Sequence, residues 1–183
     1  MQKDTDRQFG EVCRMCREVF VAKLGDYGPS WRLLRPSSVT DQLFIKAKRI
    51  RSLQVKGRSL VGDGIKGEFM ALINYAIIGV IQVRMGYVDT KDMDPALATE
   101  AYDAVAREAL DLMVKKNHDY DEAWRGMRVS SYVDFILTKI ERIKEIEEND
   151  GHTSVSEGIE SNYLDILNYA VFGVIKCLEN GIE

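Results

Sequence analysis

The chain has 183 residues, of which 45% are hydrophobic and 30% charged, as in an ordinary globular protein of one compact domain or two small ones. Its net charge of -4 disfavours a nucleic acid held by overall charge, although a local basic groove remains compatible with it. The N-terminal sequence is too polar for a signal peptide, and the longest apolar run, residues 69–81, is too short to cross a bilayer. A cytoplasmic protein without a membrane partner is therefore expected.

The chain contains two copies of one unit. Residues 23–53 align without a gap with residues 116–146 and are identical at 12 of 31 positions. Residues 65–81 align with residues 159–175 and are identical at seven of 17 positions. Similarity at a fixed spacing is the signature of a tandem duplication. The halves can therefore be compared position by position, because a residue type kept in both copies was needed twice.

Each repeat is expected to begin with an amphipathic helix, over 9–24 in the first copy, where apolar residues recur at spacings of three and four. Within that helix Cys13 and Cys16 form a C-x-x-C sequence. The equivalent positions of the second copy are Ala106 and Ala109, which can do no thiol chemistry. Packing of small apolar side chains is therefore favoured over redox or metal chemistry at these cysteines.

An aromatic loop with the pattern D-Y-x-x-x-W-R follows the first helix in both copies. Its aromatic rings could stack on a nucleobase, while its aspartates accept hydrogen bonds from the base edge or a ribose hydroxyl. The alternative, favoured for the tryptophans, is that these rings cover the core where the chain turns. The neighbouring Arg32, Arg35, Arg125 and Arg128 add positive charge near the loop and are expected to be solvated. The candidate base-binding residues are Asp26, Tyr27, Trp31, Asp119, Tyr120 and Trp124.

The second helix of each repeat is expected to begin with a capping box. Ser38 and Asp41 in the first copy correspond to Ser131 and Asp134 in the second. A serine and an acid at this spacing can satisfy the free N–H groups of a helix start. These four residues are therefore assigned a structural role and no chemical one.

The same helix carries K-x-x-R on its core-facing side in both copies. Lys46 and Arg49 correspond to Lys139 and Arg142, and each lysine falls within an apolar stripe. A lysine in such a place reaches back to solvent, pairs with a carboxylate or binds an anion. Two cations one turn apart suit a polyphosphate, and an internal salt bridge explains them equally well.

The third helix of each repeat is apolar on nearly every side and is expected to lie at the centre of the protein. Its acids differ between the copies: Glu68 occurs only in the first, and Asp165 only in the second, where Glu160 precedes it by five residues. A buried carboxylate must pair with a cation or bind a hard metal ion such as Mg²⁺. If the chain has one functional centre, it is expected near Asp165, while the number of working sites stays open.

These elements predict an all-α fold, a helical bundle built by tandem duplication of a three-helix unit about a pseudo-two-fold axis. Repeat 1 is placed at residues 1–89 and repeat 2 at residues 90–183. An isolated unit would leave its central helix half bare, so the repeats are expected to share one core as a single compact domain. Gly79 and Gly173 recur at one position of the central helices and predict a close helix contact there.

The motifs resemble those of a family called nucleotide modification associated domain 1 (DUF1599), and the resemblance covers almost the whole chain as two copies. The family pattern is a D-Y-G…W loop, a K-x-x-R-I helix and an acidic D-x-x-N-Y-A helix. The resemblance implies a role in nucleotide or base metabolism. The first copy carries the pattern at Asp26, Tyr27, Gly28, Trp31, Lys46, Arg49, Asn74, Tyr75 and Ala76, and the second at Asp119, Tyr120, Trp124, Lys139, Arg142, Asp165, Asn168, Tyr169 and Ala170.

A more distant similarity is to the all-α nucleoside triphosphate pyrophosphatases of the MazG kind. Their E-x-x-E and E-x-x-D motifs hold Mg²⁺ against a triphosphate. This chain has no clean E-x-x-E, its first copy has Ala71 in place of the aspartate, and its second copy has Asn162 in place of a glutamate. That departure puts catalysis in doubt even where nucleotide binding is retained.

The leading hypothesis is a nucleotide-binding protein of nucleotide or base metabolism. If the protein is an enzyme, the expected activity is that of a Mg²⁺-dependent nucleoside triphosphate pyrophosphohydrolase. The alternative is a non-catalytic helical module that binds a nucleotide, a nucleic acid or a protein partner and uses its charges as internal ion pairs. A homodimer is compatible with both. In the leading hypothesis the phosphate-binding residues are Lys46, Arg49, Lys139 and Arg142, and the metal ligands are Glu68, Glu160 and Asp165.

Overall fold

The computed structural model describes residues 2–57 and 64–183, and within these ranges every regular element is a helix. The all-α prediction is therefore confirmed, with three main helices in each repeat. A short 3₁₀ turn follows the first helix of each copy. In chain order the elements are α1 (Gln2–Tyr27), η1 (Ser30–Leu33), α2 (Pro36–Lys56), α3 (Ile65–Met85), α4 (Pro95–Tyr120), η2 (Ala123–Gly126), α5 (Val129–Glu148) and α6 (Ile159–Asn180).

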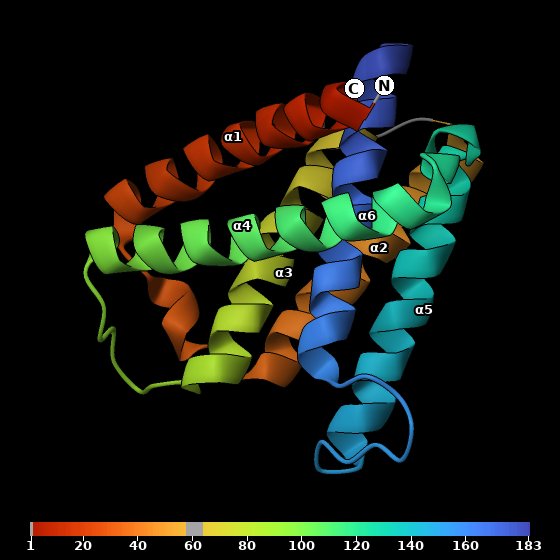
Figure 1. Cartoon of the computed structure of the whole chain (residues 1–183). Coiled ribbons are helices and arrows are strands. Elements are labelled where there is room, and N and C mark those ends of the chain that lie inside the picture. The colour runs from red at the N-terminus through yellow and green to blue at the C-terminus, as the bar shows by residue number, and fades with distance from the viewer. Residues whose placement is uncertain (1, 58–63) are drawn as a thin grey trace.

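The helices form two layers (Figure 1). In the first layer α2, α3, α6 and α5 make a four-helix arrangement in which each helix packs against two neighbours. In the second layer α1 and α4 lie side by side across α3 and α6 (Figure 1). Equivalent helices of the two repeats therefore occupy equivalent places, which is the arrangement expected of a duplicated unit.

The central helices α3 and α6 carry most of the core. Buried side chains from both repeats form one continuous hydrophobic cluster. By length and composition alone α3 could cross a membrane, but 61% of its most apolar stretch is buried inside the protein, as for a core helix. The boundaries placed at residues 89 and 90 stay a prediction.

The two central helices cross at the recurring glycines. A Cβ atom on Gly173 would lie 2.6 Å from Cε1 of Phe69, and one on Gly79 would lie 2.9 Å from Cζ of Tyr163. Phe69 and Tyr163 are themselves equivalent positions of the two repeats. The same contact is thus made twice, once in each direction, and the predicted close approach of these helices is confirmed.

The starts of α2 and α5 differ from the sequence prediction. The helices begin at Pro36 and Val129, and neither has a side-chain cap. Ser38 and Ser131 therefore lie inside the first turn, and the capping-box assignment is wrong. In α2 the proline at the first helical position takes over as the start signal, because its fixed φ already suits a helix. By contrast, Asp94 caps α4 with its side chain.

We predict that Gly173→Ala lowers the free energy of unfolding by about 1–3 kcal/mol, because the added methyl group overlaps the buried ring of Phe69. Urea unfolding would measure this loss. The matched control is Gly10→Ala in α1, where a Cβ meets nothing within 4 Å. That change should raise stability by up to about 1 kcal/mol through helix propensity. Equal stabilities for wild type and Gly173→Ala would show that the crossing is not tight.

Candidate functional site

Two pockets lie at equivalent places in the two repeats. The larger, of about 470 Å³, lies between the end of α1, the η1 loop, α2 and α3. The smaller, of about 270 Å³, lies between the end of α4, the η2 loop and α6. Each residue that lines the smaller pocket has its repeat equivalent in the wall of the larger one. We call them the first-repeat pocket and the second-repeat pocket.

In the second-repeat pocket a carboxylate joins two lysines. Asp165 Oδ1 lies 2.6 Å from Lys116 Nζ, and Oδ2 lies 2.6 Å from Lys139 Nζ. The Asp165 side chain is only 9% exposed. Burial by itself raises the pKa of Asp165, but the hydrogen bonds and charges of the two lysines outweigh it and hold that pKa below its usual range. One carboxylate therefore neutralises half of the charge of these two lysines.

The first-repeat pocket lacks this carboxylate. Its lysines, Lys23 and Lys46, are equivalent to Lys116 and Lys139, but the position of Asp165 is taken by Ala71. Lys23 is exposed and forms no ion pair with the described residues. Lys46 Nζ lies 3.5 Å from Oε2 of the buried Glu68.

Glu68 is bound by Arg49 as well as by Lys46, both from the K-x-x-R helix α2. Arg49 donates to its Oε1 atom and forms an ion pair with it, while Oε2 accepts no hydrogen bond within the described part of the chain. The side chain of Glu68 is 3% exposed and lines the first-repeat pocket. The expected meeting of the K-x-x-R helix with the acids of the central helix therefore occurs in both repeats, through Lys46 and Arg49 in one and Lys139 in the other.

The four aromatic residues of the loops all line the pockets. Trp31 and Trp124 are buried, and the indole N–H of each has no hydrogen-bond partner among the described residues. Tyr27 and Tyr120 are exposed at the edges of the pockets. The tryptophans thus cover the core and also form a pocket wall, so the two interpretations of this loop are compatible.

The other predicted site residues lie outside both pockets. Asp26 and Asp119 are exposed and line neither pocket. Arg142 is also exposed and forms no ion pair within the described ranges. Glu160 pairs with Arg84 at 2.5 Å near the start of α6. The geometry gives these four residues no part in either pocket.

The three proposed metal ligands do not come together. Among the described residues no group of three or more histidine, cysteine, aspartate or glutamate side chains could hold a metal ion. Glu68 and Asp165 each face two cationic side chains instead, and Glu160 faces Arg84. A divalent cation would have to displace these cations, so the donor set does not fit a resident Mg²⁺ ion.

Of the four loop arginines expected to be solvated, Arg35 and Arg128 are exposed, but the expectation is wrong for Arg32 and Arg125. Arg32 is 1% exposed, pairs with Asp92 at 3.0 Å and donates to the carbonyl oxygen of Gly86 at 2.7 Å. Gln82 in turn donates to the carbonyl oxygen of Arg32 at 3.1 Å. The arginine therefore fixes the loop that carries Trp31, and its recurrence in both copies was the sequence signal for this role.

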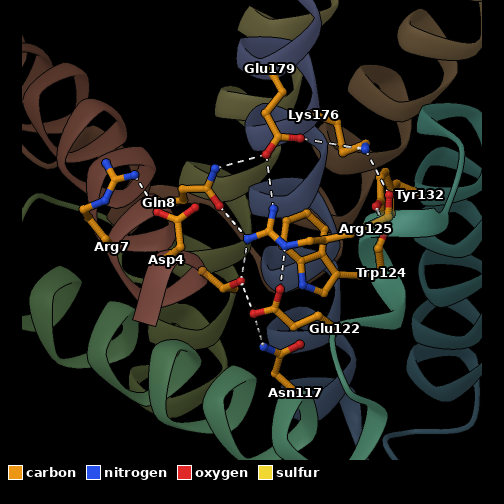
Figure 2. A network of polar contacts seen from close by, with 11 residues as sticks. Asp4, Arg7, Gln8, Asn117, Glu122, Trp124, Arg125, Tyr132, Lys176 and Glu179 are labelled. Atoms are coloured by element: carbon orange, nitrogen blue, oxygen red, sulfur yellow. Dashed lines mark hydrogen bonds and ion pairs between the residues drawn. The ribbon is translucent and has the colours of Figure 1, made fainter. Parts of the chain in front are cut away.

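Arg125 does the same in the second repeat (Figure 2). Its guanidinium lies among acceptors from α1, α6 and its own loop, and its carbonyl oxygen accepts from Lys176 at 3.0 Å. Lys176 is the repeat equivalent of Gln82, so the backbone is held in the same way. The acceptors of the Arg125 guanidinium are Glu122, Glu179, Thr5 and Gln8.

Sequence reasoning also missed the lysines of the first helices. Lys23 and Lys116 are identical in both copies, which was a usable signal. Their importance depends on how α1 and α4 cross the central helices, and periodicity within one helix does not report that.

The C-x-x-C cysteines lie in the core side of α1. Cys16 is buried and Cys13 partly buried. Burial raises the pKa of the Cys13 thiol to about 12 and also raises that of Cys16, so both stay protonated at neutral pH. This agrees with a packing role for both residues.

Comparison with known proteins identifies one family. The family model described as nucleotide modification associated domain 1 matches residues 23–83 and again residues 116–177. Each segment runs from the end of the first helix, through the loop and the K-x-x-R helix, to the central helix. No curated protein and no solved structure matches the chain. The similarity to MazG-like pyrophosphatases stays a prediction.

We predict that Asp165→Asn lowers the free energy of unfolding at neutral pH by about 1–3 kcal/mol, because it leaves two lysines without their shared carboxylate. The loss should fall short of that for a fully buried pair, since Lys116 is half exposed. Denaturant titration of both proteins would measure it.

The difference between the two proteins should also depend on pH. The pKa of Asp165 is lower in the folded protein, so its stabilising effect is complete above the unfolded pKa of about 3.9 and is lost as the pH falls through the folded value. The unfolding free energies of wild type and Asp165→Asn should therefore converge in acid. A difference that stayed constant into strong acid would show that the lysines do not hold this carboxylate.

Proposed function

The chain belongs to the nucleotide modification associated domain 1 family in two tandem copies, and from this premise we propose that it binds a nucleotide in the first-repeat pocket. The observation that carries the proposal is the exchange of Asp165 for Ala71 between otherwise equivalent pockets. The second repeat supplies an anionic group for its two lysines from within the chain. The first repeat keeps both lysines without a carboxylate between them, so an anionic ligand could bridge them.

The charge around the first-repeat pocket supports an anionic ligand. Lys23, Lys46 and Arg49 are cationic, and Glu68 is the carboxylate that faces the last two of them. In the second repeat the Asp165 carboxylate lies between Lys116 and Lys139. A phosphate at the equivalent position of the first repeat would lie between Lys23 and Lys46. Hydrogen bonds between ammonium groups and a phosphate are charge-assisted and stronger than neutral ones.

The aromatic part of the pocket supports a base. Trp31 is buried in the wall and Tyr27 is half exposed at the edge, so both offer ring surface to a planar group. Stacking of a base on an aromatic side chain contributes about 1–3 kcal/mol. At about 470 Å³ the cavity is within the range of small-molecule sites. Cations at one end and rings at the other match the two chemical parts of a nucleotide.

The surroundings of the acids on the central helices favour nucleotide binding over hydrolysis. The carboxylates that a resident Mg²⁺ ion would need face lysines and arginines. The proposed role is therefore that of a nucleotide-binding module. An assay of pyrophosphate release from nucleoside triphosphates with Mg²⁺ tests the enzymatic alternative, and turnover by the wild type would overturn the non-catalytic reading.

We predict that Ala71→Asp abolishes or weakens nucleotide binding by about tenfold to a hundredfold, because the new carboxylate takes Lys23 and Lys46 as Asp165 takes their equivalents. The substitution should be tolerated by the fold, since the second repeat carries it already. Isothermal titration with nucleoside mono-, di- and triphosphates would measure the affinities. Wild type that binds none of them, or Ala71→Asp that binds as well as wild type, would contradict the proposal.

Paired lysine variants separate binding from stability. Lys46→Ala should weaken nucleotide binding by about tenfold, the effect of losing one charge-assisted contact. The matched control Lys139→Ala should leave nucleotide affinity unchanged and lower the melting temperature, since Asp165 then keeps a single lysine. The same titrations, together with thermal unfolding, would test both. Loss of nucleotide affinity in Lys139→Ala but not in Lys46→Ala would place the nucleotide site in the second repeat and contradict the proposal.

A further inference from the structure

The second-repeat pocket contains a buried side chain whose polar atoms have no partner. Asn168 is 7% exposed and lines the pocket, and neither its amide nitrogen nor its amide oxygen has a hydrogen bond within the described part of the chain. The indole N–H of Trp124, in the same wall, is also without an acceptor there. Unpaired buried polar groups are costly, and native proteins rarely keep them without a reason.

In the first repeat the equivalent asparagine forms its hydrogen bonds within the chain. This residue, Asn74, donates to the carbonyl oxygen of Cys16 at 3.2 Å and accepts from the hydroxyl of Tyr102 at 2.7 Å. The repeat equivalent of Tyr102 is Phe9, which has no hydroxyl group. The change from tyrosine to phenylalanine on the crossing helix therefore removes the hydroxyl that would donate to the Asn168 oxygen.

The charge and size of the second-repeat pocket restrict what could satisfy Asn168. Both oxygens of Asp165 already hold lysines, so an anionic group would compete with a carboxylate that is in place. The volume of about 270 Å³ is below that of most drug-sized sites and suits one small ring system. Trp124 stacks on Phe172 at a centroid distance of 4.3 Å, and both rings line the pocket, so part of its wall is aromatic and apolar.

We propose that the second-repeat pocket binds an uncharged planar ring with adjacent hydrogen-bond donor and acceptor groups, of the cyclic amide or amidine class to which free nucleobases belong. The carboxamide of Asn168 presents a donor beside an acceptor, the complement of such an edge, as in the bidentate pairing of asparagine with adenine. The site is separate from the nucleotide site of the first repeat and does not depend on it. The two pockets thus divide ligands by charge.

The two tryptophans give each pocket its own reporter. The chain has two tryptophans, Trp31 in the first-repeat pocket and Trp124 in the second, so a ¹⁵N-labelled sample shows two indole N–H signals. Trp124→Phe identifies which signal is which. Millimolar adenine, cytosine or uracil should shift the Trp124 signal and leave that of Trp31 in place, whereas a nucleotide should shift the Trp31 signal. The Trp31 signal therefore tests the nucleotide site of the first repeat, and the Trp124 signal tests the base site of the second, so that each proposal can fail independently of the other.

A methylated probe tests the hydrogen bonds apart from the ring surface. Dimethyluracil, in which both ring N–H groups are methylated, should bind at least roughly tenfold more weakly than uracil, because it cannot donate to the Asn168 oxygen. Equal binding of the two probes would show that the pocket takes any flat ring and would overturn the proposal.

Substitution of the asparagine tests its role directly. Asn168→Leu should abolish the base-induced shift of the Trp124 signal and raise the melting temperature, since it removes two unpaired buried groups. The matched control Asn74→Leu should lower the melting temperature, since it leaves the Tyr102 hydroxyl and the Cys16 carbonyl without their partner. Phe9→Tyr should give Asn168 an internal partner and weaken base binding.

Three further results would overturn the proposal. The first is the absence of any Trp124 shift with the three bases in the wild-type protein. The second is an unchanged shift in Asn168→Leu, which would mean that the bases bind without this residue. A fall in the melting temperature of Asn168→Leu would likewise show that the carboxamide stabilises the fold and is not held in readiness for a ligand.

Discussion

The contact on which the rest of this structure depends is the crossing of α3 and α6 at two glycines. Gly79 lies against the ring of Tyr163 and Gly173 against that of Phe69, so each repeat supplies one hole and one ring. Neither half can bury its central helix without the other, which explains the single core. The crossing also fixes where α1 and α4 lie, because both pack on this helix pair. Equivalent loops are thereby held over equivalent parts of the central helices, and two similar pockets result.

On this symmetric scaffold single residues decide the chemistry. With Asp165 present, two lysines are satisfied inside the chain and contribute stability. With Ala71 in its place, Lys23 remains exposed, where a solvated ammonium costs the fold little, and Lys46 shares Glu68 with Arg49. The first repeat can therefore keep a cationic pocket without a large loss of stability. This is why we place nucleotide binding in the first repeat, although the sequence predicted the functional centre near Asp165 in the second.

The sequence predicted what depends on position within one helix or on comparison of the copies. The duplication, the buried central helices, the glycine contact and the meeting of Lys46 with an acid all follow from such patterns. It could not predict that Lys116 of α4 reaches the same carboxylate as Lys139 of α5, because that depends on the angle between two layers. The burial of Arg32 was missed for a related reason: its partner Asp92 lies beyond α3, in a connection with no pattern of its own.

The two pockets leave different polar groups without partners, and the cost of unpaired groups to stability explains why one pocket does not leave both sets unpaired. In the first, the lysines have no shared carboxylate, while both polar atoms of Asn74 are hydrogen-bonded. In the second, the lysines are paired, while the polar atoms of Asn168 have no partner among the described residues. A pocket that left both sets open would add the cost of an unpaired buried amide to that of unneutralised lysines. Because each repeat leaves one set open, one fold can present a cationic pocket and a pocket whose lysines are already paired. The duplication permits this because each copy packs against the other and keeps the core intact.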